Sequence, residues 1–263
     1  MRRIDGIVPF RGGGFAPRNL PVAGAATLLV LVALWQIGDS LGWISTLFLP
    51  APVNIARALY QLTISGELWK HLSASLSRLA VGWIIGTVFG IAVGLGVGLS
   101  SLLRSPGMAV VAALFPIPKI ALVPLFIIWF GIGEGSKIVT LAFGVFFPTV
   151  IATAGGVDNV PRSLIRMAQS FGLSHASIIR KIVLPAALPA ILSGFRVTSS
   201  IAIVLLVAAE MIGAERGIGA FVLSAGNLYD TDNLLAGIVV LSLLGLAVAG
   251  LISWLERRLL AWR

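Results

Sequence analysis

Three charged residues lie inside or at the end of long apolar stretches, and they are the residues best placed to act on a charged molecule: Lys119, Arg196 and Glu210. A charge within a bilayer is costly, so it is found where it faces protein or a water-filled path. We therefore take all three as candidates for a path through the membrane, with Lys119 attracting an anion. The alternatives remain open: Lys119 caps the carbonyls of a broken helix or extends its ammonium group to the membrane surface, and Arg196 faces a cytoplasmic loop.

Three prolines surround Lys119, namely Pro116, Pro118 and Pro124. A proline has no backbone N–H and disturbs the turn of helix before it. Irregular backbone is tolerated at membrane depth where it lines protein or a cavity filled with water. We therefore add these prolines to the candidates for the path.

Motifs that would make the chain an enzyme are missing from the sequence. It has no G-x-x-x-x-G-K-[ST] loop for ATP, no metal-ligand spacing, no paired carboxylates and no serine-nucleophile motif. It contains no cysteine and only His71 and His175 as histidines. We predict no catalytic residue, no metal and no cofactor in this chain. If ATP drives its work, a separate polypeptide must bind ATP and Mg²⁺.

Composition indicates a membrane protein. Hydrophobic residues make up 58% of the chain and charged residues 11%, whereas a soluble domain of this length has about 25% charged residues. Several apolar stretches reach the roughly 20 residues that cross a bilayer as a helix. We predict an all-α membrane protein with a cytoplasmic tail at 1–19 and one transmembrane domain at 20–263. The six predicted transmembrane helices are 20–37, 79–99, 106–130, 138–156, 186–209 and 234–255.

The distribution of charge predicts the orientation. With both termini in the cytoplasm, twelve of the nineteen Lys and Arg residues lie inside and five outside, while Lys119 and Arg196 lie within spans. Such an excess on the cytoplasmic side is the usual rule for membrane proteins. The positive charge is thus explained by topology, so we predict no nucleic-acid partner.

The second predicted span carries a glycine at every fourth position: Gly82, Gly86, Gly90, Gly94 and Gly98. These positions form a stripe along a helix, and such a stripe lets a second helix approach the backbone closely. We interpret it as a packing surface.

The cytoplasmic segment 157–185 contains two short runs of apolar residues at helical spacing, on either side of Gly172. A glycine suits the left-handed turn at the end of a helix, and Ser174 suits the N-cap of the next one. Pro185 and Pro189 follow, where a helix stops or a new one begins. We predict two amphipathic helices that bind a partner.

Gly172, nine residues and then Ile182-Val183-Leu184-Pro185 resemble the cytoplasmic loop of the membrane subunits of ABC importers. That loop reads Glu-Ala-Ala, three residues, Gly, nine residues, Ile-x-Leu-Pro. The triplet falls here on Arg166-Met167-Ala168, so one alanine matches and a cation replaces the glutamate. The resemblance implies a loop that couples to the ATPase, with these residues in it: Arg166, Ala168, Gly172, Ser174, Ile182, Leu184 and Pro185.

The segment FPIPKIALVPLFIIWFGIG at 115–133 narrows the resemblance to the sulfonate, taurine and nitrate branch of these importers. The family resemblance also extends over three other segments: LGWISTLFLPAP at 41–52, GELWKHLSASLSRL at 66–79 and VAAEMIGAERGIG at 207–219. The resemblance implies a type I ABC importer permease fold in the bacterial inner membrane. Its expected partners are a second copy of this chain, two ATPase subunits, an extracytoplasmic substrate-binding protein and membrane lipid. It also implies that Glu210 fixes the outer mouth or meets the binding protein.

Several alternatives remain open for the function. The favoured substrate is an aliphatic sulfonate or taurine; nitrate, bicarbonate and vitamin precursors such as pyrimidines or riboflavin are the others. A secondary transporter or channel that works without ATP would also have broken helices and a charge near the midplane. A structural membrane scaffold is a third class, although it would not need the prolines and lysine at 116–124.

Overall fold

The structure is a computed structural model that describes residues 21–261. The predicted cytoplasmic tail at 1–19 lies outside the described residues. The chain divides into two compact units, 1–57 and 58–263. Each unit is described by itself.

The first unit is built around α1 (Pro21–Ser40), which corresponds to the first predicted span. Its apolar side chains from Val22 to Ile37 are largely exposed within the chain. The helix α2 (Pro52–Ser65) starts in this unit and continues into the second. The Val53 N–H at its start donates to Oε1 of Gln36 at 3.3 Å, which ties the two helices together.

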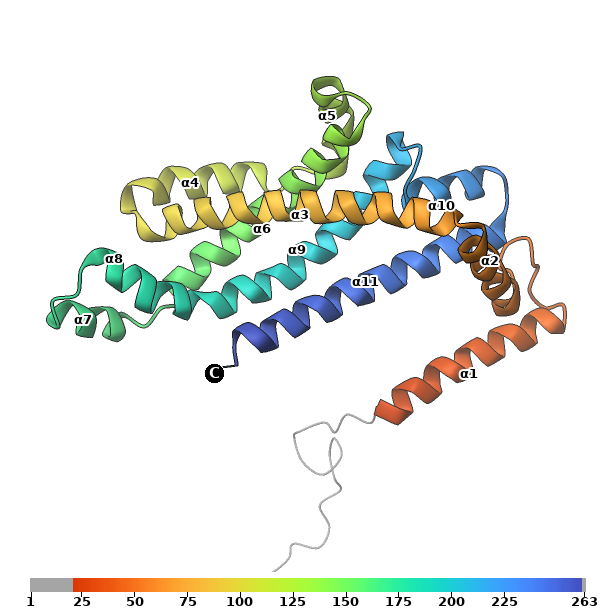
Figure 1. The fold of residues 1–263 in the computed structure, drawn as a ribbon, viewed down its shortest axis with the longest axis horizontal. Coiled ribbons are helices and arrows are strands. Elements are labelled where there is room, and N and C mark those ends of the chain that lie inside the picture. Colours follow the sequence, from red (N-terminus) through yellow and green to blue (C-terminus); the bar gives the residue numbers. More distant parts are fainter. Residues whose placement is uncertain (1–20, 262–263) are drawn as a thin grey trace, which may run out of the picture. The chain divides into compact units, whose positions relative to one another are not determined.

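The second unit contains four long helices (Figure 1): α3 (Glu67–Leu99), α6 (Glu134–Asp158), α9 (Leu184–Gly213) and α11 (Thr231–Leu259). Across the described residues, five helices are long and apolar enough to cross a membrane, and a bent pair of helices makes a sixth candidate. The described part of the chain contains no β-strand. The predicted all-α fold with six apolar spans is therefore confirmed.

The glycine stripe of α3 packs directly on α6. A Cβ added at Gly86 would lie 2.4 Å from the Ala142 carbonyl oxygen, and one at Gly90 would lie 2.6 Å from Cβ of Thr149. Gly82, Gly94 and Gly98 are equally close to α6 residues. Real Cβ atoms do not come this close to other atoms, so glycine is required along the whole seam. The predicted packing surface is confirmed.

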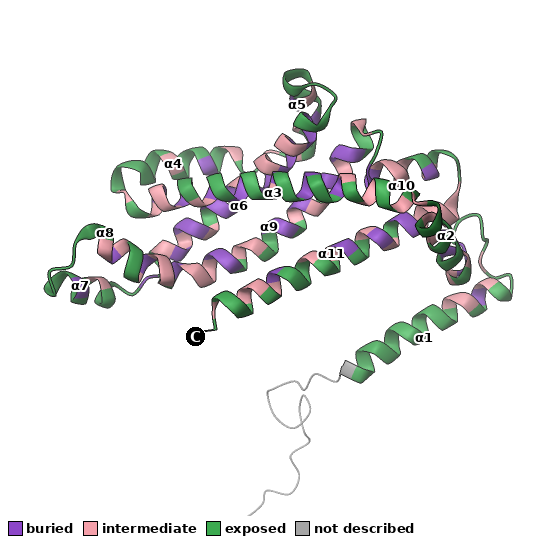
Figure 2. Cartoon of the chain, in the orientation of Figure 1, coloured by how far each residue is buried: buried purple, intermediate pink, exposed green. Residues whose placement is uncertain are grey.

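The core of this unit follows α6, which packs against α3 and α9. Leu141, Val145 and Val150 on α6 are fully buried, and so is Leu206 on α9. Figure 2 shows buried residues along α6 and α9, while α3 and α11 keep many exposed residues. Outward-facing apolar side chains are expected on helices that face lipid.

The third predicted span, 106–130, is not one helix. It consists of α4 (Ser101–Leu114), a 3₁₀ turn η1 (Lys119–Leu122) and α5 (Val123–Phe130), and the two halves are bent by 86°. Pro116 and Pro118 lie in the break, where their missing N–H groups prevent a continuous helix. Pro124 lies at the start of α5, in the first turn, where no partner for its nitrogen is needed.

Several span boundaries differ from the predicted ones. The second span begins at Glu67 rather than 79, and the fourth begins at Glu134 rather than 138. The sixth runs from Thr231 to Leu259 rather than 234–255. The charged residues at the start of the second and fourth spans, such as Glu67 and Glu134, have partners within the protein. The segment after the fifth span forms the short helix α10 (Ile218–Asn227).

The seam generates a prediction that compares two glycines of the same helix. Gly86→Ala would force a methyl group against the α6 backbone, whereas a Cβ at Gly96 would meet only Cδ1 of Leu103 at 3.5 Å. Overpacking costs about 1–3 kcal/mol, while alanine otherwise improves a helix by about 1 kcal/mol. We expect Gly86→Ala to lower the Tm in detergent by several degrees and Gly96→Ala to leave it equal or higher. Equal Tm values for the two variants would contradict a glycine seam.

Candidate functional site

The loop between α6 and α9 forms the two helices that the sequence predicts, α7 (Arg162–Ser170) and α8 (His175–Ile178). Gly172 has a φ of 70°, in the left-handed region. The Leu173 N–H donates to the Ala168 carbonyl at 3.1 Å and the Gly172 N–H to the Gln169 carbonyl at 2.9 Å. These two bonds form a Schellman motif, so Gly172 ends α7 and turns the chain into α8.

Ser174 caps α8, as predicted. Its Oγ accepts from the Ser177 N–H at 3.3 Å. Figure 1 shows α7 and α8 at the end of the second unit opposite α10. We name this segment, 157–185, the α7–α8 loop.

The two helices of the loop are packed together rather than hanging free. Ala168 is 1% exposed and forms a buried cluster with Val160, Ile178 and Val183. Ile165 and Ile182 are partly buried against this cluster. Because residues from both helices share one small core, the loop can move as one body.

No helix stops at Pro185, contrary to one of the two predicted outcomes. The helix runs from His175 through a π-helical turn, η2 (Ile179–Val183), into α9, and ends at Gly213 after 39 residues. In the π turn the Leu184 N–H donates to the Ile179 carbonyl, five residues back. Proline normally clashes with the carbonyl four residues before it, and a π turn just ahead of Pro185 widens the helix there. The α7–α8 loop is thus joined to α9 without a flexible break.

An ionic cluster lies near the other end of the bundle. Arg78 of α3 is only 4% exposed, and its Nε and Nη2 donate to the two oxygens of Glu134 at 2.6 and 2.7 Å. Its Nη1 donates to Oε1 of Glu210 at 2.8 Å and to the Arg216 carbonyl at 2.6 Å. One guanidinium therefore ties together α3, α6, the end of α9 and the loop that follows α9.

Glu210 is the centre of this cluster, and it is 1% exposed. Ser75 Oγ donates to both of its oxygens, at 2.8 and 3.0 Å, and the Gly219 N–H donates to Oε2 at 2.9 Å. A Cβ at Gly217 would lie 2.4 Å from Cδ of Glu210, so the loop closes directly over the carboxylate. Glu210 therefore binds protein groups on all sides and is enclosed within this chain.

A wide basin of about 680 Å³ opens beside the cluster, lined in part by Arg78, Glu134, Glu215 and Arg216. Buried Lys137 also lines it, and its Nζ donates to the carbonyls of Ile132 and Gly133 at 3.0 and 3.1 Å. Arg78 with its two carboxylates has one net negative charge, which Lys137 balances. The cluster is therefore close to neutral and has the character of a lock between helices rather than of an ion-binding site.

Lys119 lies at the break of the bent span. Its Nζ donates to the Phe115 carbonyl, just after α4 ends, and lies 4.9 and 5.5 Å from the ring centroids of Phe115 and Phe147. Capping of a broken helix, which the sequence left open, is thus one role of Lys119. The ammonium group has three N–H donors, so the cap leaves donors for a solute.

Two ion pairs link helices nearer the α7–α8 end. Arg196 of α9 binds Glu256 of α11 at 2.5 Å. Its ion-pair partner therefore lies on α11 and not on the α7–α8 loop. Arg104 of α4 holds both oxygens of Asp158 at the end of α6, each at 2.7 Å. All four side chains are at least a quarter exposed, so these pairs are accessible and open at low cost.

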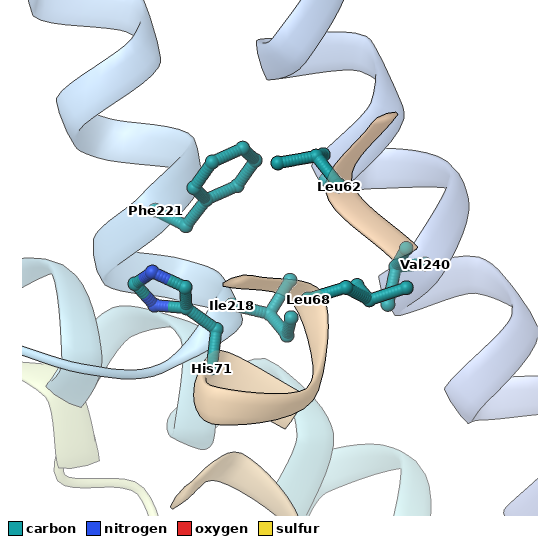
Figure 3. Close-up of a pocket in the computed structure, with 7 residues that line it drawn as sticks. Leu62, Leu68, His71, Ile218, Phe221 and Val240 are labelled. Atoms are coloured by element: carbon teal, nitrogen blue, oxygen red, sulfur yellow. The ribbon is translucent and has the colours of Figure 1, made fainter. Parts of the chain in front are cut away.

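Figure 3 shows a second, apolar gap near the cluster, lined by Leu62, Leu68, Ile218 and Val240. The His71 and Phe221 rings lie 5.3 Å apart between their centroids at its side. Its volume is about 10 Å³, which is room for no more than one water molecule. This gap is too small for a substrate. The described residues contain no group of three or more His, Cys, Asp or Glu side chains that could hold a metal ion.

The sequence alone did not indicate Arg78, Glu134 and Ser75 as members of a cluster around Glu210. Arg78 and Glu134 lie far from Glu210 in the sequence, and a serine carries no signal of its own. One signal was available: a buried charge needs a partner of opposite sign, and Glu210 lies at the end of an apolar run.

Residues 86–261 match the family described as "Binding-protein-dependent transport system inner membrane component". The aliphatic sulfonates transport permease SsuC of Escherichia coli K12 is 41% identical over 247 residues, which are 94% of this chain and 91% of that protein. The taurine transport system permease TauC of the same organism is 40% identical over 243 residues, with 90% and 88% covered.

A solved structure described as an inward-facing conformation of the MetNI methionine ABC transporter has the same fold. Its TM-score is 0.62 at 23% identity, and the match covers 73% of this chain and 94% of that one. This agrees with the fold expected from the loop and span motifs. The chain therefore belongs to the family of inner membrane components of binding-protein-dependent transport systems, as a multi-pass permease subunit without catalytic function of its own.

Proposed function

We propose that this chain forms the membrane path of an ATP-driven importer for a small organic anion, with an aliphatic sulfonate or taurine favoured. The observation that carries the proposal is the α7–α8 loop, whose glycine turn is joined without a break to α9. The names of the SsuC and TauC relatives support the substrate class. Nitrate, bicarbonate and vitamin precursors are the other substrates considered.

The proposed assembly contains two copies of this chain, two ATPase subunits and an extracytoplasmic binding protein, with both termini of the chain in the cytoplasm. ATP and Mg²⁺ bind to the ATPase subunits. The α7–α8 loop sits on an ATPase subunit and moves with it, because its two helices share one core. The 39-residue helix from His175 to Gly213 then carries that motion to the far end of the bundle.

The path itself is proposed to run along the bent span and α9. Pro116, Pro118 and Pro124 shape the bend, and Lys119 supplies positive charge beside it. Arg196 would influence the path through its exposed pair with Glu256. Glu210 is enclosed, so we propose that it fixes the outer mouth, where the binding protein delivers the substrate, through its bonds to Arg78 and Ser75.

The coupling proposal is tested at Gly172. A Cβ at this position meets nothing within 4 Å, so a substitution acts through its backbone conformation alone. Valine is strongly disfavoured at a φ of 70°, whereas asparagine is tolerated there. We expect Gly172→Val to lose most of the co-purified ATPase and of the transport, and Gly172→Asn to keep both. Wild-type transport and complex yield in Gly172→Val would reject the assignment of the loop.

The role of Lys119 is tested by removing its charge but keeping a hydrogen-bond donor. Glutamine can still donate to the Phe115 carbonyl, so Lys119→Gln separates attraction of an anion from capping. A single charge in a pathway changes the local concentration of an ion about tenfold. We expect about tenfold slower uptake of radiolabelled taurine or an aliphatic sulfonate in Lys119→Gln, and much less change in Lys119→Arg. Unchanged uptake of every anionic substrate would refute an electrostatic role.

The ionic cluster is tested by comparing a buried pair with an exposed one. Arg78→Gln leaves the buried Glu210 without its cation, which costs about 3–5 kcal/mol, or about 10 °C in Tm for a chain of this size. Arg104→Gln removes the accessible pair with Asp158. We expect a large loss of Tm in the first variant and little in the second, measured by tryptophan fluorescence in detergent. If both variants melt like wild type, Arg78 does not lock the helices.

A further inference from the structure

Large apolar side chains remain uncovered on the outside of the α7–α8 loop. Leu164, Met167 and Phe171 are 40%, 50% and 78% exposed, although other parts of the same helix are buried. Their spacing of three and four residues places them along one face of α7 and its C-cap. Phe171 lies directly before the Gly172 turn, which holds it at the tip of the loop. An exposed stripe of this kind marks a surface that a partner covers.

Four cations lie on the same loop without a counter-charge. Arg162 and Arg166 are one turn apart on α7, and Arg180 and Lys181 lie in the π turn; all four are exposed. None of them is within 4 Å of a carboxylate in the part of the chain that the structure describes. Asp158 is the only acid in the loop, and Arg104 already binds both of its oxygens. The surface therefore has a net positive charge that residues 21–261 do not balance.

From these two observations we infer the chemistry of the docking partner: an apolar pocket that takes Phe171 and Met167, with carboxylates along the side that faces Arg162 and Arg166. This inference rests on the proposed function, in which the partner is an ATPase subunit. It adds the sign of the charge on the partner's surface, which must be negative, because basic residues along this rim would be repelled by the loop. The cation at position 166 is central, since it projects beside the apolar stripe on the same helix.

The two parts of the surface have different physical roles. Aromatic and apolar anchors in the centre of an interface mainly slow dissociation, because their burial is lost when the complex opens. Charges at the rim mainly speed association and make it depend on salt. The inference therefore predicts separate kinetic effects for Phe171 and for Arg166.

The experiment measures association and dissociation rates between the detergent-solubilised chain and the ATPase subunit that co-purifies with it, expressed separately. Arg166→Glu reverses one rim charge, and Arg257→Glu makes the same charge change at an exposed position in the last turn of α11. At 50 mM NaCl we expect association about tenfold slower for Arg166→Glu and unchanged for Arg257→Glu. Raising NaCl to 500 mM should slow association with the wild-type chain about tenfold and abolish the difference between the two variants.

Phe171→Ser tests the apolar part and, with it, the proposed function. We expect dissociation about 100-fold faster, with association and its salt dependence nearly unchanged. If no ATPase binds the wild-type chain, the proposed function fails. If the ATPase binds and needs Phe171, but Arg166→Glu associates as fast as wild type, only the inferred acidic rim is overturned. The same holds if Arg257→Glu slows association as much as Arg166→Glu does.

Discussion

The close contact between the α3 and α6 backbones is the constraint on which the rest of the second unit depends. Five glycines along α3 leave no room for even a methyl group against α6. In a bilayer, lipid competes well for apolar surfaces, so helices associate mainly through close packing and polar contacts. The seam fixes α6 as the central helix, and α9 can then pack on its other side.

The ionic cluster becomes possible because of this seam. Arg78 lies on the same helix as the glycines, so the register of α3 on α6 brings its guanidinium to both oxygens of Glu134. A buried charge is stabilised only by partners with good geometry, and here four segments supply them. Through Arg78, the network therefore holds α9 and the loop after it to the closely packed pair of α3 and α6.

The sequence predicted local features well and distant partnerships poorly. Gly172 and Ser174 have conformations and hydrogen bonds set by their near neighbours, so both roles could be assigned before the structure. The glycine stripe was also visible, because its spacing repeats along one helix. Glu210 was placed correctly at the end of a span, but its partner Arg78 lies 132 residues away. The 86° bend at the third span was hidden too, since prolines indicate a break but not its angle.

A continuous helix from the loop into α9 must accommodate Pro185, and the π turn before it does so. Pro185 would break an ordinary α-helix, yet the Ile179–Val183 turn accommodates it without exposing a hinge. A flexible hinge would let the loop rock while α9 stayed still. A π turn keeps the backbone hydrogen-bonded and the side-chain core of the loop intact. In the proposed importer, the α7–α8 loop and α9 would therefore move together, and the ionic cluster around Glu210 would pass that motion to α3 and α6 at the far end of α9.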